Sequence, residues 1–375
     1  MALNLYAGEP QHENFVKMDQ IYPVSRMEAA SSPFEFPVGS NTALPKTFQF
    51  SGEERDTSAF LASTDTSAVL VLKNGKIRTE EYYLTGGQDV CWISWSVAKS
   101  FISALVGIAI DEGLINDVND SITDYVHTLK PSAYNGVSIR DVLQMSSGAR
   151  WNEDYSDRSS DIHRLGRAMA GEQSLAEFVA GIESGTEPGT FCQYNSADTQ
   201  ALGMLITSVT NRSIADYMQE KLCEPLGMEH SGHWIVDKSV MEMALGGLNL
   251  VARDFAKIGE LYRNGGRWGQ QQVVPEEWVK DSTKSNEEHL QPGKVIVGGH
   301  VFPCGYGYQW WVPEGNEGEF SAIGVYNQFV FVNPTCGTVV VKLSANRAYG
   351  TTGEEHSNRE EETIAFVRAI AREVD

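Results

Sequence analysis

The residues of this sequence best suited to chemistry are Ser96 and Lys99, in the tetrapeptide Ser96-Val97-Ala98-Lys99. On a helix, residues three positions apart share one face, so the serine hydroxyl and the lysine amine can touch. A helix N-terminus adds positive potential and free backbone N–H groups beside the serine. In apolar surroundings the pKa of the lysine should fall, which favours the neutral amine. The pattern therefore predicts a nucleophile beside its own general base.

Spacing alone carries little weight, because a chain of this composition is expected to contain a Ser-x-x-Lys by chance. The bland alternative is a lysine whose amine snorkels out to solvent. The surrounding segment favours chemistry, since residues 96–112 are apolar almost all round the predicted helix. Such a helix must be buried, and Gly113 supplies its C-terminal stop.

The elements that must position this helix are predicted from turn signals and periodicity. Before it, residues 67–84 form two β-rich runs around Asn74-Gly75, a strong hairpin signal. Residues 1–60 are expected to be an extended arm with short elements, and residues 150–173 a polar loop over a site. Helices are predicted at 138–146, 174–182, 197–210, 213–223, 251–264 and 359–374.

Strand patterns return after Gly305. Three antiparallel strands are predicted, in GYQWWVP, in GEFSAIGVYNQFVFVNP and in GTVVVKLSAN, with Pro-Thr-Cys-Gly as a hairpin turn. The economical fold is α/β (α+β), with one antiparallel sheet flanked by the terminal helices. Residues 1–115 and 295–375 would form this α/β domain, and residues 116–294 an inserted, mostly helical domain.

Composition excludes some partners. Acidic residues outnumber basic ones by 50 to 29 in the 375-residue chain, and a net charge of −21 disfavours both nucleic acid and anionic membranes. The N-terminal residues lack the pattern of a signal peptide, and no apolar run approaches the roughly 20 residues that cross a bilayer. The five cysteines show no disulfide or zinc spacing, so a reduced, cytoplasmic protein is expected. No phosphate loop, dinucleotide fingerprint or metal-ligand cluster is found, and no cofactor is predicted.

Four segments in order resemble the penicillin-recognising serine hydrolases, which include β-lactamases, DD-peptidases, family VIII carboxylesterases and 6-aminohexanoate-dimer hydrolases. They are the Ser-x-x-Lys motif, DVLQMSSG (141–148), GGL followed by ARDFAKIG (246–259), and YGYQWW (306–311). The resemblance covers nearly the whole chain after the N-terminal arm. It implies a β-lactamase/DD-peptidase-like fold, with Ser96 as nucleophile and Lys99 as base.

The family's second motif, Tyr-x-Asn, matches Tyr194-Asn195-Ser196. The resemblance makes Tyr194 the residue that passes a proton between nucleophile, lysine and leaving group. A phenol beside an ammonium group should have a lowered pKa, which suits that role. Ser196 stands in place of the family's asparagine, in a motif that is also altered in the aminohexanoate-dimer hydrolases, and is expected to contact substrate.

The third motif, Lys/His-Thr/Ser-Gly, corresponds to Ala322-Ile323-Gly324. The glycine is kept, whereas the cation and hydroxyl that bind the carboxylate of β-lactams are absent. Val325 is expected to complete the oxyanion hole with Ser96, because a backbone N–H survives any side-chain change. Gly324 and Tyr326 are expected at the substrate pocket.

The segment Trp151-Asn-Glu-Asp-Tyr155 resembles a loop of the 6-aminohexanoate-dimer hydrolases. The resemblance implies that Tyr155 hydrogen-bonds at the scissile amide and that Asp161 receives the amino group of the substrate. His163 is interpreted as a solvated loop residue. Leu245 replaces a polar residue of that enzyme group, which counts against nylon-oligomer activity.

The predicted function is hydrolysis of small carboxylic esters, with linear amides as further substrates, through a Ser96 acyl-enzyme. The alternatives are an amide hydrolase of the 6-aminohexanoate-oligomer type and, disfavoured by the missing cation, a β-lactamase. A non-catalytic ligand-binding or interaction protein of the same fold is a further alternative. The presence of Ser96, Lys99 and Tyr194 counts against it.

Overall fold

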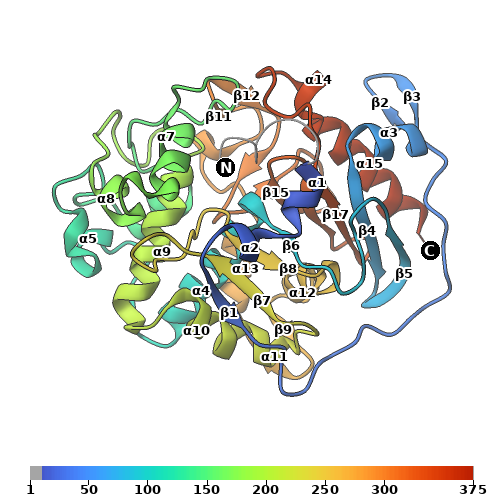
Figure 1. Cartoon of the computed structure of the whole chain (residues 1–375), viewed down its shortest axis with the longest axis horizontal. Coiled ribbons are helices and arrows are strands. Elements are labelled where there is room, and N and C mark those ends of the chain that lie inside the picture. Colours follow the sequence, from blue (N-terminus) through green and yellow to red (C-terminus); the bar gives the residue numbers. More distant parts are fainter. Residues whose placement is uncertain (1–10, 375) are drawn as a thin grey trace.

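The computed structural model describes residues 11–374. It contains a seven-stranded sheet, which lies beside a helical region (Figure 1). Every neighbouring pair of strands runs antiparallel. In spatial order the strands are β13 (Gly305–Tyr306), β14 (Trp311–Val312), β15 (Phe320–Gly324), β16 (Gln328–Asn333), β17 (Thr338–Ser344), β4 (Thr66–Lys73) and β5 (Lys76–Tyr82). Residues 66–82 thus pair with strands from the far end of the chain, which confirms the sheet built from both ends.

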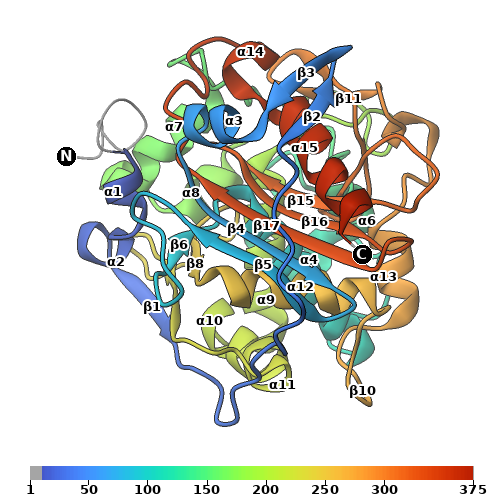
Figure 2. The same cartoon turned by 90° about the vertical axis from the view of Figure 1, so that its right-hand side faces the viewer.

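Helices cover both faces of this sheet. Figure 2 shows α15 (Glu360–Glu373) in front of the strands and α12 (Ala252–Arg263) behind them. Because side chains alternate along a strand, Val69 and Val71 pack toward α15 whereas Leu70 and Leu72 join the larger core on the other face. This two-sided burial explains why the central strands are almost continuously apolar.

The helix α12 belongs with the sheet, although the sequence analysis placed it in the helical domain. A Cβ added at Gly259 would lie 2.7 Å from the Val339 side chain and 3.0 Å from that of Val330. The missing side chain therefore lets this helix lie directly on β16 and β17. The predicted domain boundaries stay a prediction, and the packing shows only that this helix contacts the sheet.

Two tight turns join neighbouring strands of the sheet. The Asn74-Gly75 turn between β4 and β5 is confirmed, with both residues at positive φ. The predicted long strand through residues 318–334 is wrong, because it folds back on itself between β15 and β16. Tyr326 and Asn327, at φ 63° and 67°, make this tight turn, which Gly324 and Gln328 close as a pair.

The helical region carries short helices around one long one. Its members are α5 (Ile122–Tyr125), α6 (Ile139–Leu143), α7 (Asp161–Arg167), α8 (Leu175–Ala180), α9 (Ser196–Thr210), α10 (Ile214–Met218) and α11 (Glu224–Leu226). The expected loop 150–173 is therefore partly helical, since α7 lies within it. The predicted buried helix is present as α4 (Ala98–Asp111), which packs against α9.

The remaining elements are short. The described part of the N-terminal arm holds α1 (Gln11–Phe15), α2 (Met18–Ile21), β1 (Val24–Met27), β2 (Thr47–Phe50), β3 (Glu53–Asp56) and α3 (Thr57–Ser63). A second sheet, ordered β1-β7-β8-β6, joins that arm to β7 (Gly232–Ile235), β8 (Leu248–Leu250) and β6 (Trp92–Ile93). Elsewhere lie β9 (Arg267–Trp268), β10 (Gln271–Gln272), α13 (Glu276–Ser282), β11 (Val295–Val297), β12 (His300–Phe302) and α14 (Glu355–Asn358).

All five cysteines are free thiols, as the sequence spacing predicts. Within residues 11–374, none of the helices combines the length and apolar character that a membrane crossing requires.

We expect Gly259→Val to destabilise the fold by about 1–3 kcal/mol, because the new side chain would overpack the interface of α12 with the sheet. Urea unfolding measures this change. Gly166→Val is the matched control, since Gly166 is also helical but faces open space. Equal stability of the two variants would contradict the close packing of α12.

Candidate active site

Ser96 lies in a tight turn between the short strand β6 and the long helix α4. A 3₁₀ turn, Trp95–Val97, leads directly into that helix. Trp95 has a φ of 44°, a left-handed backbone conformation that non-glycine residues seldom adopt. The backbone N–H of Ser94 donates to the carbonyl of Leu248 at 2.7 Å, which ties the turn to the second sheet. The turn thereby presents Ser96 at the start of a buried helix.

The Lys99 amine is surrounded by oxygen atoms. Its Nζ lies 2.8 Å from Ser96 Oγ, 2.7 Å from the carbonyl oxygen of Leu245 and 3.2 Å from Ser196 Oγ. The side chain is 1% exposed. Burial lowers the pKa of Lys99 to about 7, against a smaller opposing effect of the Glu153 charge. The structure thus has the predicted contact between Lys99 and Ser96, and the pKa of Lys99 is lowered as predicted.

Tyr194 is held beside this pair by aromatic packing. Its ring stacks on Trp311 with 5.1 Å between centroids, and Lys99 Nζ lies 5.3 Å from the ring centroid. The backbone N–H of Tyr194 donates to the Ile296 carbonyl at 2.8 Å. The predicted fall in its pKa is wrong: burial first, and then the charge of Glu153, raise the pKa of Tyr194 well above its usual value. A hydrogen bond with Ser96 acts in the opposite direction. Tyr194 is therefore a neutral phenol.

Ser196, the residue in place of the family's asparagine, connects Lys99 to a buried carboxylate. Its hydroxyl accepts from Lys99 and donates to Glu153 Oε1 at 2.6 Å. Glu153 is 1% exposed and also accepts from the backbone N–H of Ser196 at 3.1 Å. The sequence predicts that Ser196 contacts substrate, whereas in the structure its hydroxyl contacts Lys99 and Glu153.

The loop that carries Glu153 is held together by hydrogen bonds between its own residues. Tyr155 donates its hydroxyl to Glu153 Oε1 at 2.9 Å, and the indole N–H of Trp151 donates to Glu153 Oε2. His163, interpreted from the sequence as solvated, has its Nε2 2.9 Å from the Tyr155 carbonyl oxygen. Asp161 accepts from the Asn152 backbone N–H at 2.9 Å and pairs with Arg164 at 2.6 Å. The carboxylate of Asp161 therefore fixes this loop, and Asp161 does not line the cavity described below.

The β15–β16 turn lies against the nucleophile. A Cβ added at Gly324 would lie 2.7 Å from the Ser94 carbonyl oxygen and 3.0 Å from the Ser96 backbone nitrogen. Val325 follows directly, which places the next backbone N–H at the same edge. Tyr326 packs between Trp95 and Tyr349, with centroids 5.5 and 5.4 Å away. The structure thus brings the third predicted motif to Ser96.

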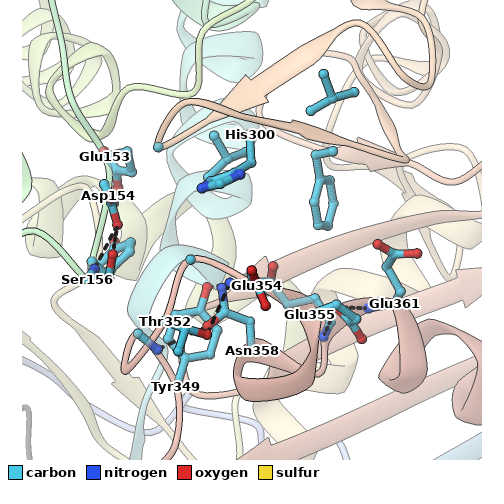
Figure 3. A pocket seen from close by; sticks show the side chains of 18 residues that line it. Glu153, Asp154, Ser156, His300, Tyr349, Thr352, Glu354, Glu355, Asn358 and Glu361 are labelled. Atoms are coloured by element: carbon cyan, nitrogen blue, oxygen red, sulfur yellow. Dashed lines mark hydrogen bonds between the residues drawn. The ribbon is translucent and has the colours of Figure 1, made fainter.

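A cavity of about 260 Å³ opens beside Tyr155 and Glu153 (Figure 3). Figure 3 shows Glu153, Asp154 and Ser156 on one side, facing His300 of β12 and the segment from Tyr349 to Glu361. Val297, Val301 and Phe302 give it an apolar wall, whereas Glu354, Glu355, Glu360 and Glu361 give it an acidic one. Burial raises the pKa of Glu355 to about 8 and that of Glu360 to about 7.

Comparison with known proteins identifies the family of this chain. A sequence profile of the family described as Beta-lactamase matches residues 53–364. The chain belongs to the beta-lactamase family. It is a serine hydrolase of that family, with antiparallel strands flanked by helices.

The proteins that are similar to this chain differ in their named activities. A 6-aminohexanoate-dimer hydrolase of Paenarthrobacter ureafaciens is 30% identical over 293 residues, which are 76% of this chain and 74% of that protein. A solved Bacillus anthracis protein, provisionally assigned as a 6-aminohexanoate-dimer hydrolase, has a TM-score of 0.86 at 21% identity and covers 98% of this chain and 95% of its own. A family VIII carboxylesterase has a TM-score of 0.63 at 15% identity, over 84% of this chain and 94% of its own. The last two likenesses show the fold alone.

Sequence reasoning missed Glu153 as a member of the site. Its segment was singled out for Tyr155, but alternate residues of an extended chain point the same way. That alternation places Trp151 and Tyr155 on the same side as Glu153, where both donate to it. A carboxylate between two aromatic hydrogen-bond donors was the available signal.

We expect the rate at which Ser96 reacts to rise with pH through about 7 and then level off, because Lys99 must lose its proton to act as base. The labelling rate with a fluorophosphonate probe, followed by mass spectrometry, measures this. Lys99→Arg should lower the rate about 10²–10⁴-fold, since a guanidinium stays charged. A pH-independent rate between pH 5 and 9 would contradict the role of Lys99.

We expect Gly324→Ala to lower that labelling rate by about 10²-fold, because its methyl group must displace the nucleophile turn or β15. Gly166→Ala, in open space, is the matched control. Circular dichroism establishes that both variants fold. An unchanged rate in folded Gly324→Ala would show that β15 does not support Ser96.

Proposed function

We propose that this protein hydrolyses small carboxylic esters, and linear amides as further substrates, through an acyl-enzyme on Ser96. The observation that carries the proposal is the Lys99 amine, 2.8 Å from Ser96 Oγ and with a pKa of about 7. At neutral pH much of this amine is uncharged, so it can accept the serine proton as a C–O bond forms.

In the proposed acylation, Ser96 Oγ attacks the substrate carbonyl and its proton passes to Lys99 Nζ. The carbonyl electron pair moves to the oxygen, which the backbone N–H groups of Ser96 and Val325 stabilise by roughly 2.7–4 kcal/mol per donor. The ammonium then returns the proton through the Tyr194 hydroxyl to the leaving oxygen or nitrogen, as its bond to the carbonyl carbon breaks. A neutral phenol suits this relay, because it can accept one proton while it donates another.

In deacylation, Lys99 and Tyr194 together remove a proton from water, and the oxygen of that water attacks the acyl carbonyl. The Ser96 oxygen leaves and takes the proton back, and the carboxylic acid is released. The net reaction consumes one water and regenerates the neutral amine.

Esters are favoured over amides because an alkoxide or phenoxide leaves with little protonation. The alternative, an amide hydrolase of the 6-aminohexanoate-oligomer type, is supported by the 30% identical relative of that name. It is also supported by Tyr155, which lines the cavity and donates its hydroxyl to Glu153. From there it could support a leaving nitrogen.

The cavity favours neutral or cationic substrates. Its lining in the described structure includes six acidic residues and no lysine or arginine. Together with the missing Lys/His of the third motif, this leaves a substrate carboxylate without a cationic partner in the cavity lining. We therefore place β-lactams below esters and amides.

We expect a p-nitrophenyl short-chain ester to be hydrolysed fastest, an aminohexanoate dimer more slowly and nitrocefin slowest. Each kcat/KM is measured with wild type, and Ser96→Ala is the control that must abolish turnover. A dimer rate above the ester rate would favour the amide hydrolase. Turnover of nitrocefin that rivals the ester would overturn the order.

A further inference from the structure

A buried cation forms at Lys99 during the proposed reaction, and it has no direct counter-ion in the described residues. The three partners of its amine are the Ser96 and Ser196 hydroxyls and the Leu245 carbonyl oxygen. All of them are neutral, whereas the side chain is 1% exposed. An isolated ammonium in such a place is costly, so the charge that compensates it must act from the next shell of atoms.

Glu153 is the carboxylate in that position. Its two oxygens accept from four donors: the Ser196 hydroxyl at 2.6 Å, the Tyr155 hydroxyl at 2.9 Å, the Ser196 backbone N–H at 3.1 Å and the Trp151 indole. All four contacts bring a hydrogen to the carboxylate, and none of these donors is a cation. Its single link to a basic group runs through Ser196 to Lys99.

Other titratable groups near Lys99 are poor counter-ions. Tyr194, from the segment before α9, is a neutral phenol because burial raises its pKa. Asp198, within α9, is fully buried, and burial raises its pKa to about 8 despite hydrogen bonds from Tyr134 and Ser147. Lys99 meets the β7–β8 connection through the Leu245 carbonyl oxygen, which is uncharged. Of the neighbouring charges, that of Glu153 is the one that favours the charged amine.

We propose that Glu153 is a positioning residue for this reaction, which holds Ser196 as a bridge to Lys99 and stabilises the ammonium that forms when Ser96 gives up its proton. The inference rests on the proposed function. No proton needs to reach Glu153, because the Ser196 hydroxyl keeps its own hydrogen toward the carboxylate while it accepts from the lysine. Glu153 thus supplies charge and orientation, and Lys99 remains the base.

The decisive variant is Glu153→Gln, and the readout is the pH dependence of two rates. These are the labelling of Ser96 by a fluorophosphonate and the kcat/KM for p-nitrophenyl acetate. Loss of the negative charge should move the acidic limb of both profiles to lower pH by about one unit. The plateau rate should fall about tenfold, because a less basic amine takes the serine proton less readily.

Two further variants separate the effect of the Glu153 charge from that of the Ser196 hydroxyl that bridges it to Lys99. Glu153→Asp keeps the charge and should leave the limb near its wild-type pH, even where the plateau falls. Ser196→Ala keeps the carboxylate but removes the bridge, so it should lower the plateau with a smaller shift of the limb. Asp157→Asn is the matched control, since it removes a carboxylate from the same loop outside the cavity lining. It should change neither quantity.

If Glu153→Gln folds and the acidic limb of its pH–rate profiles stays at the wild-type pH, the inference is overturned and Glu153 has a structural role. Should that variant fail to fold, an unchanged plateau and limb in Ser196→Ala would overturn it equally. Failure of wild type to label at Ser96 at any pH would instead count against the proposed function. The two ideas therefore fail on different measurements.

Discussion

The interaction on which the structure depends is the burial of one lysine amine against one serine hydroxyl. Water would solvate that amine and keep it charged, so every wall around it must exclude water and still offer oxygen atoms to its N–H groups. The fold meets both demands. The apolar helix α4 packs against α9, and three oxygens from separate parts of the chain converge on Lys99 Nζ.

Those oxygens come from regions that the sequence keeps far apart. The serine belongs to the turn before α4, Ser196 begins α9, and the Leu245 carbonyl lies just before the strand β8. The backbone at Trp95 and the absent side chain at Gly324 bring the turn and the central sheet together. The site thus lies where the sheet and the helical region meet, and neither part contains it alone.

Much of this arrangement is readable from sequence where the signal is local. Asn74-Gly75, the apolar run of α4 and the Ser-x-x-Lys spacing each follow from a few neighbouring residues, and the family motifs extend them. The missed features depend on contacts distant in sequence. The turn at Tyr326-Asn327 interrupts a run of strand-forming residues. The packing of α12 on the sheet is decided by Val330 and Val339. The pKa of Tyr194 depends on the depth of its burial, and its sequence neighbours indicate only an aromatic residue before a helix.

The two sides of the cavity differ in how they connect to the nucleophile. The segment 151–155 is joined to Lys99 through Glu153 and Ser196, whereas the acidic wall at residues 354–361 lies on the opposite side and has no such hydrogen bond to the amine. A substitution in the first segment alters the lining of the cavity and the surroundings of Lys99 together. The second segment meets the site elsewhere, because the carbonyl oxygen of Asn358 accepts from the Asn327 side chain in the β15–β16 turn and the charge of Glu360 helps to raise the pKa of Tyr194. Both walls of the cavity are therefore constrained by the groups around Ser96, one through the base and the other through the β15–β16 turn and the phenol.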